Sequence, residues 1–501
     1  MPLDSNRLTS RLREILRHHP APAGVSDEAR PLSDAGATGA EPTDVVASDD
    51  AASDTAAPVR ELRYVPDDDV ISGADVASGC VQLERQYDPV LTHGPHAVSR
   101  YAETLTRCLS ALAVLAADPG AAVTSRAPRA QRLQWGSDAR FPRDDRRRVG
   151  APTAGPLLFF DLETTGLSGG AGTLAFLVGC GYFEADGFHT LQYFLSGYEA
   201  EHELLQHLTA LVSRFSGLVT FNGRTFDVPL IETRYLFHRL ESPFASLPHF
   251  DMLQPARRLW RRRGGATRAH RQRWSGGSAG DAASCSLGAL EEAILGVQRF
   301  DDVPGFEIPG RYFNYLRTGD LEPLQGVFEH NRLDLLSLAA LTALAAQMAD
   351  EGPGGVPSPH EALAMGQIYE RLGRLEEADA CFARASGMGV VPWEADAVDP
   401  VIRADALRAL ARHRRRQHRH DDAAAAWRTL LESGAAPDYQ QEARRALAIH
   451  HEHRARDFGA ARHFAAHALE SERDPAEADA LRHRLARLDR KLGRQSPDDT
   501  L

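Results

Sequence analysis

The apolar run at residues 157–162 constrains the fold more than any other part of the sequence, and it contains a single carboxylate, Asp161. A run of this length and composition is typical of a strand that is buried on both faces of a sheet. Two more strand patterns follow at residues 173–183 and 188–194, separated by a turn at residues 184–187. The sequence therefore predicts a sheet that begins as a meander.

Helical periodicity and one more strand follow this meander. Residues 217–221 form a short apolar run, which predicts a fourth strand. Apolar residues at helical spacing predict helices at residues 201–215, 225–240, 287–295 and 323–348. Strands that first form a meander and then alternate with helices predict a mixed α/β sheet, which we place at residues 154–350.

The rest of the chain divides by composition. A length of 501 residues predicts two or three domains. Residues 1–58 contain few large apolar side chains, so we expect this segment to be largely disordered. Residues 59–153 form a small region and a linker to which the sequence assigns no function, although residues 97–117 have helical periodicity.

Charge and cysteine content exclude several classes of protein. The net charge of −12 gives the chain no overall attraction for nucleic acid, so any such contact must depend on local basic patches or bound metal. The five cysteines are far apart, which argues against a disulfide framework or a structural zinc site. No signal-peptide pattern is visible, and the longest apolar helical stretch, residues 335–348, is too short to span a bilayer. We therefore expect a cytoplasmic protein with no membrane contact.

Three short acidic motifs fall within the predicted α/β domain. Asp161 and Glu163 are two residues apart in a strand, so their side chains point to the same face. Asp227 follows the fourth predicted strand and lies near the start of the next helix. His330 and Asp334 are four residues apart, so they lie on one face of a helix, one turn from each other.

These residue types suit the hydrolysis of phosphodiester bonds. Two Mg²⁺ or Mn²⁺ ions about 3.5–4 Å apart activate water and stabilise the leaving oxygen, and such hard cations prefer oxygen ligands. Asp334 lies on an otherwise apolar helix face, where a carboxylate is costly unless it is paired or bound to metal. A neutral imidazole at His330 suits a general base near pH 7. The four carboxylates therefore predict a two-metal nuclease site.

In their order and spacing, these motifs resemble those of the DEDD 3′–5′ exonuclease superfamily, whose members have a ribonuclease-H-like fold. More narrowly, residues 156–350 resemble the YprB-type ribonuclease-H-like domain. That resemblance also rests on four other motifs: His249-Phe-Asp251-Met-Leu, Arg258-Leu-Trp260, Ser286-Leu-Gly-Ala-Leu290 and Pro309-Gly-Arg-Tyr312. The resemblance implies that the metal ligands are Asp161, Glu163, Asp227 and Asp334. The chain departs from the family at His330, because one branch has Tyr at this spacing and another has His one residue earlier.

Other polar residues near the motifs are candidates for binding the substrate: Thr164, Thr165, Asn222, Asp251 and Asn331. Asp251 suits the capping of a turn equally well. The insertion at residues 253–284 is rich in Arg and Gly, with Trp260 and Trp274 interleaved. It is either a solvated loop or a flap that grips phosphates, because arginine and aromatic rings suit single-stranded nucleic acid.

Residues 357–495 are expected to be helical and repetitive. One group of residues has the spacing of a tetratricopeptide (TPR) helical hairpin: Gly366, Tyr369, Gly373, Leu375, Ala378, Phe382 and Ala385. Weaker echoes follow at Ala411, Ala423 and Trp427, and at Ala448, Ala460 and Phe464. One hairpin cannot bury its own faces, so we expect a stack of hairpins. This region either binds a partner protein or covers the catalytic domain.

Together these features predict a metal-dependent nuclease, specifically a 3′–5′ exonuclease that acts on single-stranded DNA or RNA. Asp161 would bridge the two ions, and Glu163 and Asp334 would complete the water-activating site. Asp227 would support the second ion, and His330 would orient or deprotonate the water. Two alternatives stay open, which are a non-catalytic adaptor that uses the nuclease fold as a platform and a structure-selective endonuclease.

Overall fold

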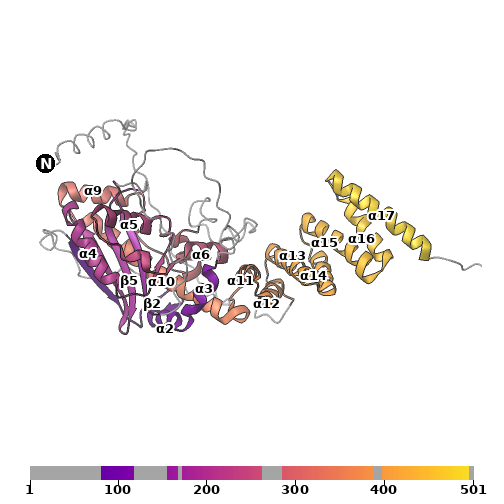
Figure 1. Ribbon diagram of the computed structural model, residues 1–501, viewed down its shortest axis with the longest axis horizontal. Coiled ribbons are helices and arrows are strands. Elements are labelled where there is room, and N and C mark those ends of the chain that lie inside the picture. Colours follow the sequence, from indigo (N-terminus) through magenta and orange to yellow (C-terminus); the bar gives the residue numbers. More distant parts are fainter. Residues whose placement is uncertain (1–79, 118–154, 167–171, 262–284, 389–397, 496–501) are drawn as a thin grey trace, which may run out of the picture. The chain divides into compact units, whose positions relative to one another are not determined.

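The computed structural model describes residues 80–117, 155–166, 172–261, 285–388 and 398–495. The predicted disordered segment and most of the Arg/Gly-rich insertion lie outside these residues. The described core is a mixed sheet of six strands in the order β1-β6-β5-β4-β7-β8, and helices follow it in the chain (Figure 1). This architecture confirms the predicted fold class, a mixed α/β sheet followed by an all-helical region.

The meander predicted from the sequence forms the centre of the sheet. Strand β4 (Leu157–Thr164) pairs antiparallel with β5 (Ala175–Glu184), and β5 pairs antiparallel with β6 (Gly187–Leu195). Gly187 in the β5–β6 turn has a φ of 138°, and a Cβ there would meet the backbone of strand β1 at 2.1 Å. Strand β1 (Cys80–Tyr87), which the sequence did not predict, pairs with β6 and forms an edge of the sheet.

The other half of the sheet is parallel. Strand β7 (Gly217–Thr220) pairs with β4, and β8 (His249–Asp251), a strand that the sequence did not predict, pairs with β7. Parallel neighbours need crossover connections, and helices α4 (Glu201–Val212) and α5 (Asp227–Phe237) lie within them. The carboxyl ends of β4 and β7 therefore lie at the same edge of the sheet.

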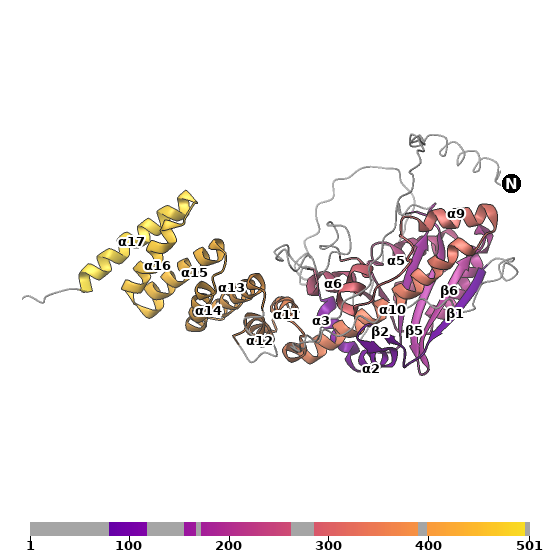
Figure 2. The same ribbon diagram turned by 180° about the vertical axis from the view of Figure 1, so that it is seen from behind.

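Helix α10 (Glu322–Glu351) runs along one face of the sheet and contacts β4, β5 and β6 (Figure 2). It extends slightly beyond both ends of the predicted helix. Within the described residues it is the one helix with the length and composition of a membrane span, but 72% of its apolar window is buried inside the protein. That burial is expected for a helix at the centre of a core.

The two faces of β4 enter different cores. Alternate residues of the strand pack with α4 and α5: Leu158, Phe160 and Leu162. Leu157 and Phe159 lie in the other core, which includes most of α10. Because side chains alternate along a strand, Asp161 and Glu163 share the face of Phe159. Both carboxylates therefore lie on the side of the sheet that α10 covers.

The segment at residues 80–117, to which the sequence assigned no function, is built onto this side as well. Besides β1 it contains β2 (Thr92–His93), β3 (His96–Ala97), α2 (Val98–Cys108), η1 (Leu109–Ala111) and α3 (Leu112–Ala116). Helices α2 and α3 pack against α10 in the shared core. The hydroxyl group of Tyr101 donates to the carbonyl oxygen of His93 at 2.6 Å, which ties α2 to the β2–β3 hairpin.

Shorter elements complete the sheet domain: η2 (Tyr198–Ala200), η3 (Pro243–Ser246), α6 (Leu253–Leu259), α8 (Leu287–Leu290), the π-helix η5 (Glu291–Leu295), α9 (Ile308–Thr318) and η6 (Gly352–Gly355). The single helix predicted at residues 287–295 is therefore one turn of α-helix that continues as π-helix. Helix α9 was not predicted. Its Tyr312 stacks on Phe176 of β5 with ring centroids 4.1 Å apart.

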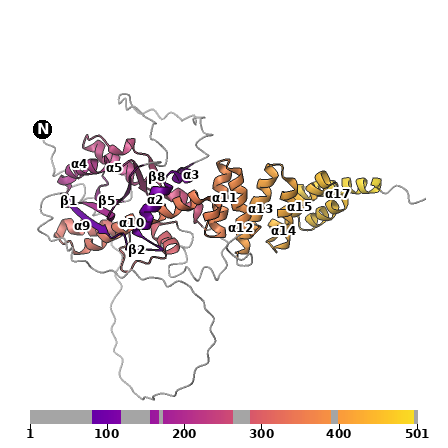
Figure 3. The same ribbon diagram turned by 90° about the horizontal axis from the view of Figure 1, so that it is seen from below.

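The C-terminal residues form seven α-helices within the described ranges: α11 (Pro359–Arg371), α12 (Leu375–Ser386), α13 (Pro400–Arg416), α14 (His420–Glu432), α15 (Pro437–His450), α16 (Phe458–Glu470) and α17 (Pro475–Gln495). Successive helices contact one another (Figure 3). Three of the turns share one geometry, because Gly373, His418 and Arg456 each have a φ between 56° and 73°. The buried residues of α16 are Ala461, Ala465 and Ala468, and the predicted Ala460 is not among them. The region thus repeats a helical hairpin.

In the first hairpin a small residue lets two helices approach. Gly366 of α11 faces Phe382 of α12, and a Cβ at this glycine would lie 2.6 Å from the phenyl ring. The ring is fully buried. The missing side chain at Gly366 therefore makes room for the ring of Phe382.

We expect Gly366→Ala to destabilise the helical region by about 1–3 kcal/mol, because the added methyl group overpacks the α11–α12 contact. Gly310→Ala is the matched control, since Gly310 lies in helix α9 with nothing within 4 Å of an added Cβ. The control should change stability by no more than about 1 kcal/mol and in the stabilising direction. Urea unfolding followed by circular dichroism would measure both changes. Equal free energies of unfolding for the two variants would contradict the close α11–α12 contact.

Candidate metal centre

Strand β4 supplies the first two carboxylates. Asp161 pairs across the sheet with Gly179 of β5. A Cβ at Gly179 would lie 2.2–2.7 Å from the amide of Asn331, so the missing side chain leaves room for that amide. The freed space lets Asn331 of α10 reach the strand, and its Nδ2 donates to Oδ2 of Asp161 at 2.8 Å. Glu163 lies two residues further along and is half-buried. The glycine thus allows α10 to approach the carboxylate face.

Helix α10 supplies His330 and Asp334 on the same side. Nε2 of His330 lies 3.6 Å from Oδ2 of Asp334 and 4.0 Å from Oε1 of Glu163. The structure therefore brings the first and third sequence motifs together, although 170 residues separate Asp161 from Asn331. The imidazole stands between a carboxylate from the strand and one from the helix.

Asp227 is the first residue of α5, and it lies close enough to Asp161 and Glu163 for its charge to raise their pKa values. The turn before it contains Asn222, whose φ is 67°, a left-handed conformation that asparagine tolerates. Asp251 holds this turn, because its carboxylate accepts hydrogen bonds from the backbone N–H groups of Asn222 and Arg224 at 2.8 and 3.0 Å. A third backbone donor, Leu253, approaches at 3.0 Å. The turn before Asp227 is therefore fixed by β8, a strand that the sequence did not predict.

The electrostatics of the site show that these acids act on one another. Burial raises the pKa of Asp161 well above its usual range, and the charges of Asp334, Glu163 and Asp227 raise it further. Burial raises the pKa of Glu163 to about 8, against the opposing effect of His330. Burial also raises the pKa of Asp227 to about 7. Carboxylates that are crowded and desolvated in this way gain most from a divalent cation.

The surroundings of His330 favour the protonated form of its ring. Burial alone would lower the pKa of His330, but its hydrogen bond to Asp302 and the charges of Asp334 and Glu163 outweigh burial and raise that pKa to about 9. Nδ1 of His330 lies 2.7 Å from Oδ1 of Asp302. The hydrogen bond to Asp302 and the neighbouring carboxylates therefore favour the protonated ring over the neutral imidazole that we expected from the sequence. Cations bound by Glu163 and Asp334 would cancel charges that raise its pKa.

Sequence reasoning missed Arg299, Glu291 and Asp302. The side chain of Arg299 is 8% exposed, and it donates from Nε to Glu291 and from its NH2 group to Asp334, both at 2.6 Å. Its NH1 group lies 3.5 Å from Asp302. No spacing rule relates residues 8 and 35 positions from Arg299. A lone arginine beside two aspartates was the only visible signal.

The residues proposed for substrate binding differ in their placement. Asn331 is fully buried and donates to Asp161, so it positions that carboxylate and does not face a substrate. Asp251 is 9% exposed and its oxygens are taken up by backbone donors, so its observed role is to hold the turn. Thr164 donates to the carbonyl of Gly166, and the hydroxyl of Thr165 accepts from a backbone N–H. Both threonines are half-buried beside the acids.

The described start of the Arg/Gly-rich insertion does not offer a stacking ring. Trp260 is only 7% exposed and belongs to the core with α10. Arg258 donates to the carbonyl oxygens of Leu115 and Ala117, both at 3.2 Å. These contacts correct the expectation that Trp260 contributes to a nucleic-acid flap, while Trp274 lies outside the described residues.

The donor atoms of the acidic site are carboxylate oxygens and one imidazole, which suit hard divalent cations. Among the described residues, three ligand atoms within 4.8 Å of one another occur at Glu184, Asp186 and His189, at the opposite end of β5. The four predicted carboxylates are not part of that group. Asp161 accepts a hydrogen bond from Asn331, and Asp334 accepts one from Arg299.

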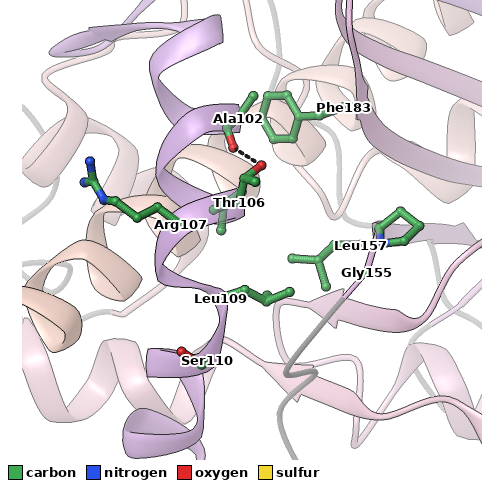
Figure 4. Close-up of a pocket in the computed structure, with 10 residues that line it drawn as sticks. Ala102, Thr106, Arg107, Leu109, Ser110, Gly155, Leu157 and Phe183 are labelled. Atoms are coloured by element: carbon green, nitrogen blue, oxygen red, sulfur yellow. Dashed lines mark hydrogen bonds between the residues drawn. The ribbon is translucent and has the colours of Figure 1, made fainter.

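A cavity of about 520 Å³ lies elsewhere, between α2 and the start of β4 (Figure 4). Leu157 and Phe183 line its wall on the sheet side, and Thr106 and Leu109 line it on the other side. Leu157 is four residues before Asp161, which is about 13 Å along a strand. The lining contains neither a carboxylate nor an imidazole. The cavity is therefore separate from the acidic site.

Comparison with known proteins places the chain in a family. Residues 158–346 match the RNase H superfamily. The chain is also 30% identical over 344 residues to the protein named "Uncharacterized protein YprB" of Bacillus subtilis (strain 168), and the alignment covers 67% of this chain and 75% of that relative. The chain belongs to the YprB family, within the RNase H superfamily. Its RNase H-like nuclease domain begins in β4 and ends in α10, so it contains all four predicted carboxylates.

The raised pKa values predict how stability depends on pH. Glu163, Asp227 and His330 all have a folded-state pKa above the ordinary value, so each contributes stability that is complete below its unfolded pKa and is lost as pH rises through its folded pKa. With a chelator present, we expect the melting temperature to fall by several degrees between pH 6 and about pH 9. Added Mn²⁺ should reverse most of this fall at pH 8.

Thermal melts followed by circular dichroism would measure this dependence. Glu163→Gln should flatten it, since the variant lacks the carboxyl group that titrates near pH 8. Asp186→Asn, at an exposed acid of the β5–β6 turn, should keep the wild-type profile. A constant melting temperature from pH 6 to pH 9 in the chelated wild type would show that the four acids are not crowded as described.

Proposed function

We propose that this protein is a divalent-metal-dependent nuclease of the DEDD type, and that it acts as a 3′–5′ exonuclease on single-stranded DNA or RNA. One observation carries the proposal. Asp161 and Glu163 of β4 lie close to Asp227 of α5 and Asp334 of α10, and the charges of these two residues raise the pKa values of both β4 carboxyl groups. Membership of the RNase H superfamily supports the same chemistry.

Each residue has a role that its contacts support. Two Mg²⁺ or Mn²⁺ ions would lower the pKa of the attacking water and stabilise charge on the leaving oxygen. Asp161 is held by Asn331 at one oxygen, which leaves the other oxygen free to take part in holding both ions. Glu163 and Asp334 would hold the ion that activates water, and Asp227 would hold the second. His330 would orient the water or accept its proton once cations have lowered the pKa of the ring.

Exposed aromatic rings beside the acids support a single-stranded substrate. Phe226 directly precedes Asp227 and is 53% exposed, and Phe300 directly follows Arg299 and is also 53% exposed. Exposed rings suit the stacking of unpaired bases, which is worth about 1–3 kcal/mol per base. The net charge of −12 gives no general attraction for nucleic acid, so binding would depend on these rings and on the metal ions.

The C-terminal helices would serve as a TPR-like region that binds a partner protein. The repeated left-handed turns at Gly373, His418 and Arg456, and the contact of Gly366 with Phe382, support this proposal. We place the protein in the cytoplasm, without membrane contact, on the basis of its five scattered free cysteines.

The decisive test is the degradation of end-labelled DNA and RNA oligomers by the full chain with Mn²⁺. We expect Asp161→Asn to lower the rate by more than about 100-fold, because changes even to residues that support metal ligands cost about 10–100-fold. Asp186→Asn, which removes an exposed acid of the same domain, should leave the rate unchanged. Wild-type cleavage by Asp161→Asn would exclude the proposed site.

The products of the same reaction separate the two alternatives. Mononucleotides released from the 3′ end support an exonuclease, whereas internal fragments identify an endonuclease. Binding of oligomers without hydrolysis in Mg²⁺ or Mn²⁺ would instead favour the adaptor, in which the RNase H-like domain is a platform.

A further inference from the structure

A buried chain of polar contacts connects the N-terminal segment with the acidic site. Nε2 of His93, in β2, lies 2.8 Å from the hydroxyl oxygen of Ser337 in α10. That hydroxyl group donates to Oε1 of Glu291, in the π-helix η5, at 2.5 Å. The other oxygen of Glu291 accepts from Nε of Arg299, and the NH2 group of Arg299 donates to Oδ1 of Asp334, each at 2.6 Å.

Hydrogen-bonding capacity fixes the direction of this chain. A serine hydroxyl group has one proton, and Ser337 uses it for Glu291, so its oxygen must accept from His93. His93 therefore carries its proton on Nε2. Arg299 presents a rigid planar fork, and the contact of its Nε with Glu291 sets the direction in which the NH2 group points at Asp334. The orientation of one carboxylate in the site thus depends on Glu291.

Water cannot replace these partners. His93 and Glu291 are each 1% exposed, and Ser337 is fully buried. A buried polar group that loses its partner is destabilised by the full cost of its desolvation. Each hydrogen bond of this series therefore fixes the position of the next residue. Burial lowers the pKa of His93 to about 3, which keeps the ring neutral and leaves it as a plain hydrogen-bond donor.

The β2–β3 hairpin is placed to support the π-helix that carries Glu291. Gly94, with a φ of 67°, sits against Leu295 at the end of that helix, where a Cβ would lie 2.9 Å away. Tyr101 of α2 donates to the carbonyl oxygen of His93, so the backbone of the hairpin is fixed independently of the imidazole. The hairpin, the π-helix and α10 therefore meet at the side chain of Ser337.

Arg299 also reaches the histidine of the site through a branch. Its NH1 group lies 3.5 Å from Oδ2 of Asp302, and Oδ1 of Asp302 lies 2.7 Å from Nδ1 of His330. A shift of the guanidinium group would therefore move Asp334 and Asp302 together.

We propose that His93, Ser337 and Glu291 are positioning residues that act through Arg299 to orient Asp334 for metal binding, so that residues 80–117 belong to the catalytic unit. This inference rests on the proposed function, because it assigns the N-terminal segment a role in the same site. These hydrogen bonds connect β2, η5 and α10, which no single sequence motif contains. Through Arg299 they would orient Asp334 of α10 relative to β4.

The first test uses Ser337→Ala and Thr342→Val in the full-length protein. Each variant removes one buried hydroxyl group from α10, but that of Thr342 bonds only to the backbone of its own helix. Titration calorimetry with MnCl₂ should show about tenfold weaker binding for Ser337→Ala, as is usual for residues that support metal ligands. Thr342→Val should bind as the wild type does. Equal affinities in all three proteins would overturn the proposal.

Two substitutions at His93 test the far end of the chain and give a conservative rescue. Gln in place of His93 keeps an N–H donor for Ser337, whereas Leu keeps only the bulk. We expect His93→Leu to weaken Mn²⁺ binding and lower kcat, with KM for the oligomer unchanged, and His93→Gln to restore both. Loss of the same size in both variants would mean that His93 acts only by filling space.

A measurement without metal separates failure of this inference from failure of the proposed function. In protein labelled with ¹⁵N at arginine Nε, the Arg299 signal is identified by its absence in Arg299→Lys. Its Nε–H should exchange with solvent slowly, and roughly tenfold faster in Ser337→Ala, as expected for the loss of one supporting hydrogen bond. Unchanged exchange would overturn the inference. If the wild type binds no Mn²⁺ but Ser337→Ala still speeds the exchange of the Arg299 Nε–H, the hydrogen-bonded connection from Ser337 to Arg299 is supported and the nuclease proposal fails.

Discussion

The structure depends on how the repulsion between four partly buried carboxylates is contained at one edge of a sheet. Asp161 and Glu163 project from β4 into the space that α10 covers, where burial and mutual charge raise their pKa values. Three groups contact these carboxylates: the amide of Asn331 and the cationic side chains of Arg299 and His330. Asn331 bonds to Asp161, Arg299 bonds to Asp334, and His330 lies between Asp334 and Glu163.

Helix α10 is the element through which this arrangement is built. Within two turns it contributes His330, Asn331, Asp334 and Ser337, and the remainder of the helix is buried in apolar cores. Gly179 of β5 makes the close approach possible. Helix α10 is both a core element and the source of polar side chains of the site. It therefore fixes the distance between strand and helix carboxylates, because any shift of its polar turns would disturb packing along its whole length.

Much of the fold and part of the site could be predicted from local patterns. The meander, the parallel strand at residues 217–221 and the long helix each have their own periodicity, and the spacing of Asp161 and Glu163 places both on one face of a strand. Strands β1 and β8 could not be predicted in this way, since β8 is very short and β1 is held by its partner β6. Asn331 was assigned to the substrate because a motif shows which residues are adjacent but not which of them is buried.

The sequence by itself determined which carboxylates are available and which elements carry them, because strand and helix periods decide the face on which a side chain lies. Only the tertiary structure decided their neighbours. Arg299, Glu291 and Asp302 join the site through contacts with residues of α10 that are distant in sequence, and His93 reaches it across α10. Such contacts follow from how elements pack, and packing is set by complementary shape and burial over the whole core, which no local spacing records.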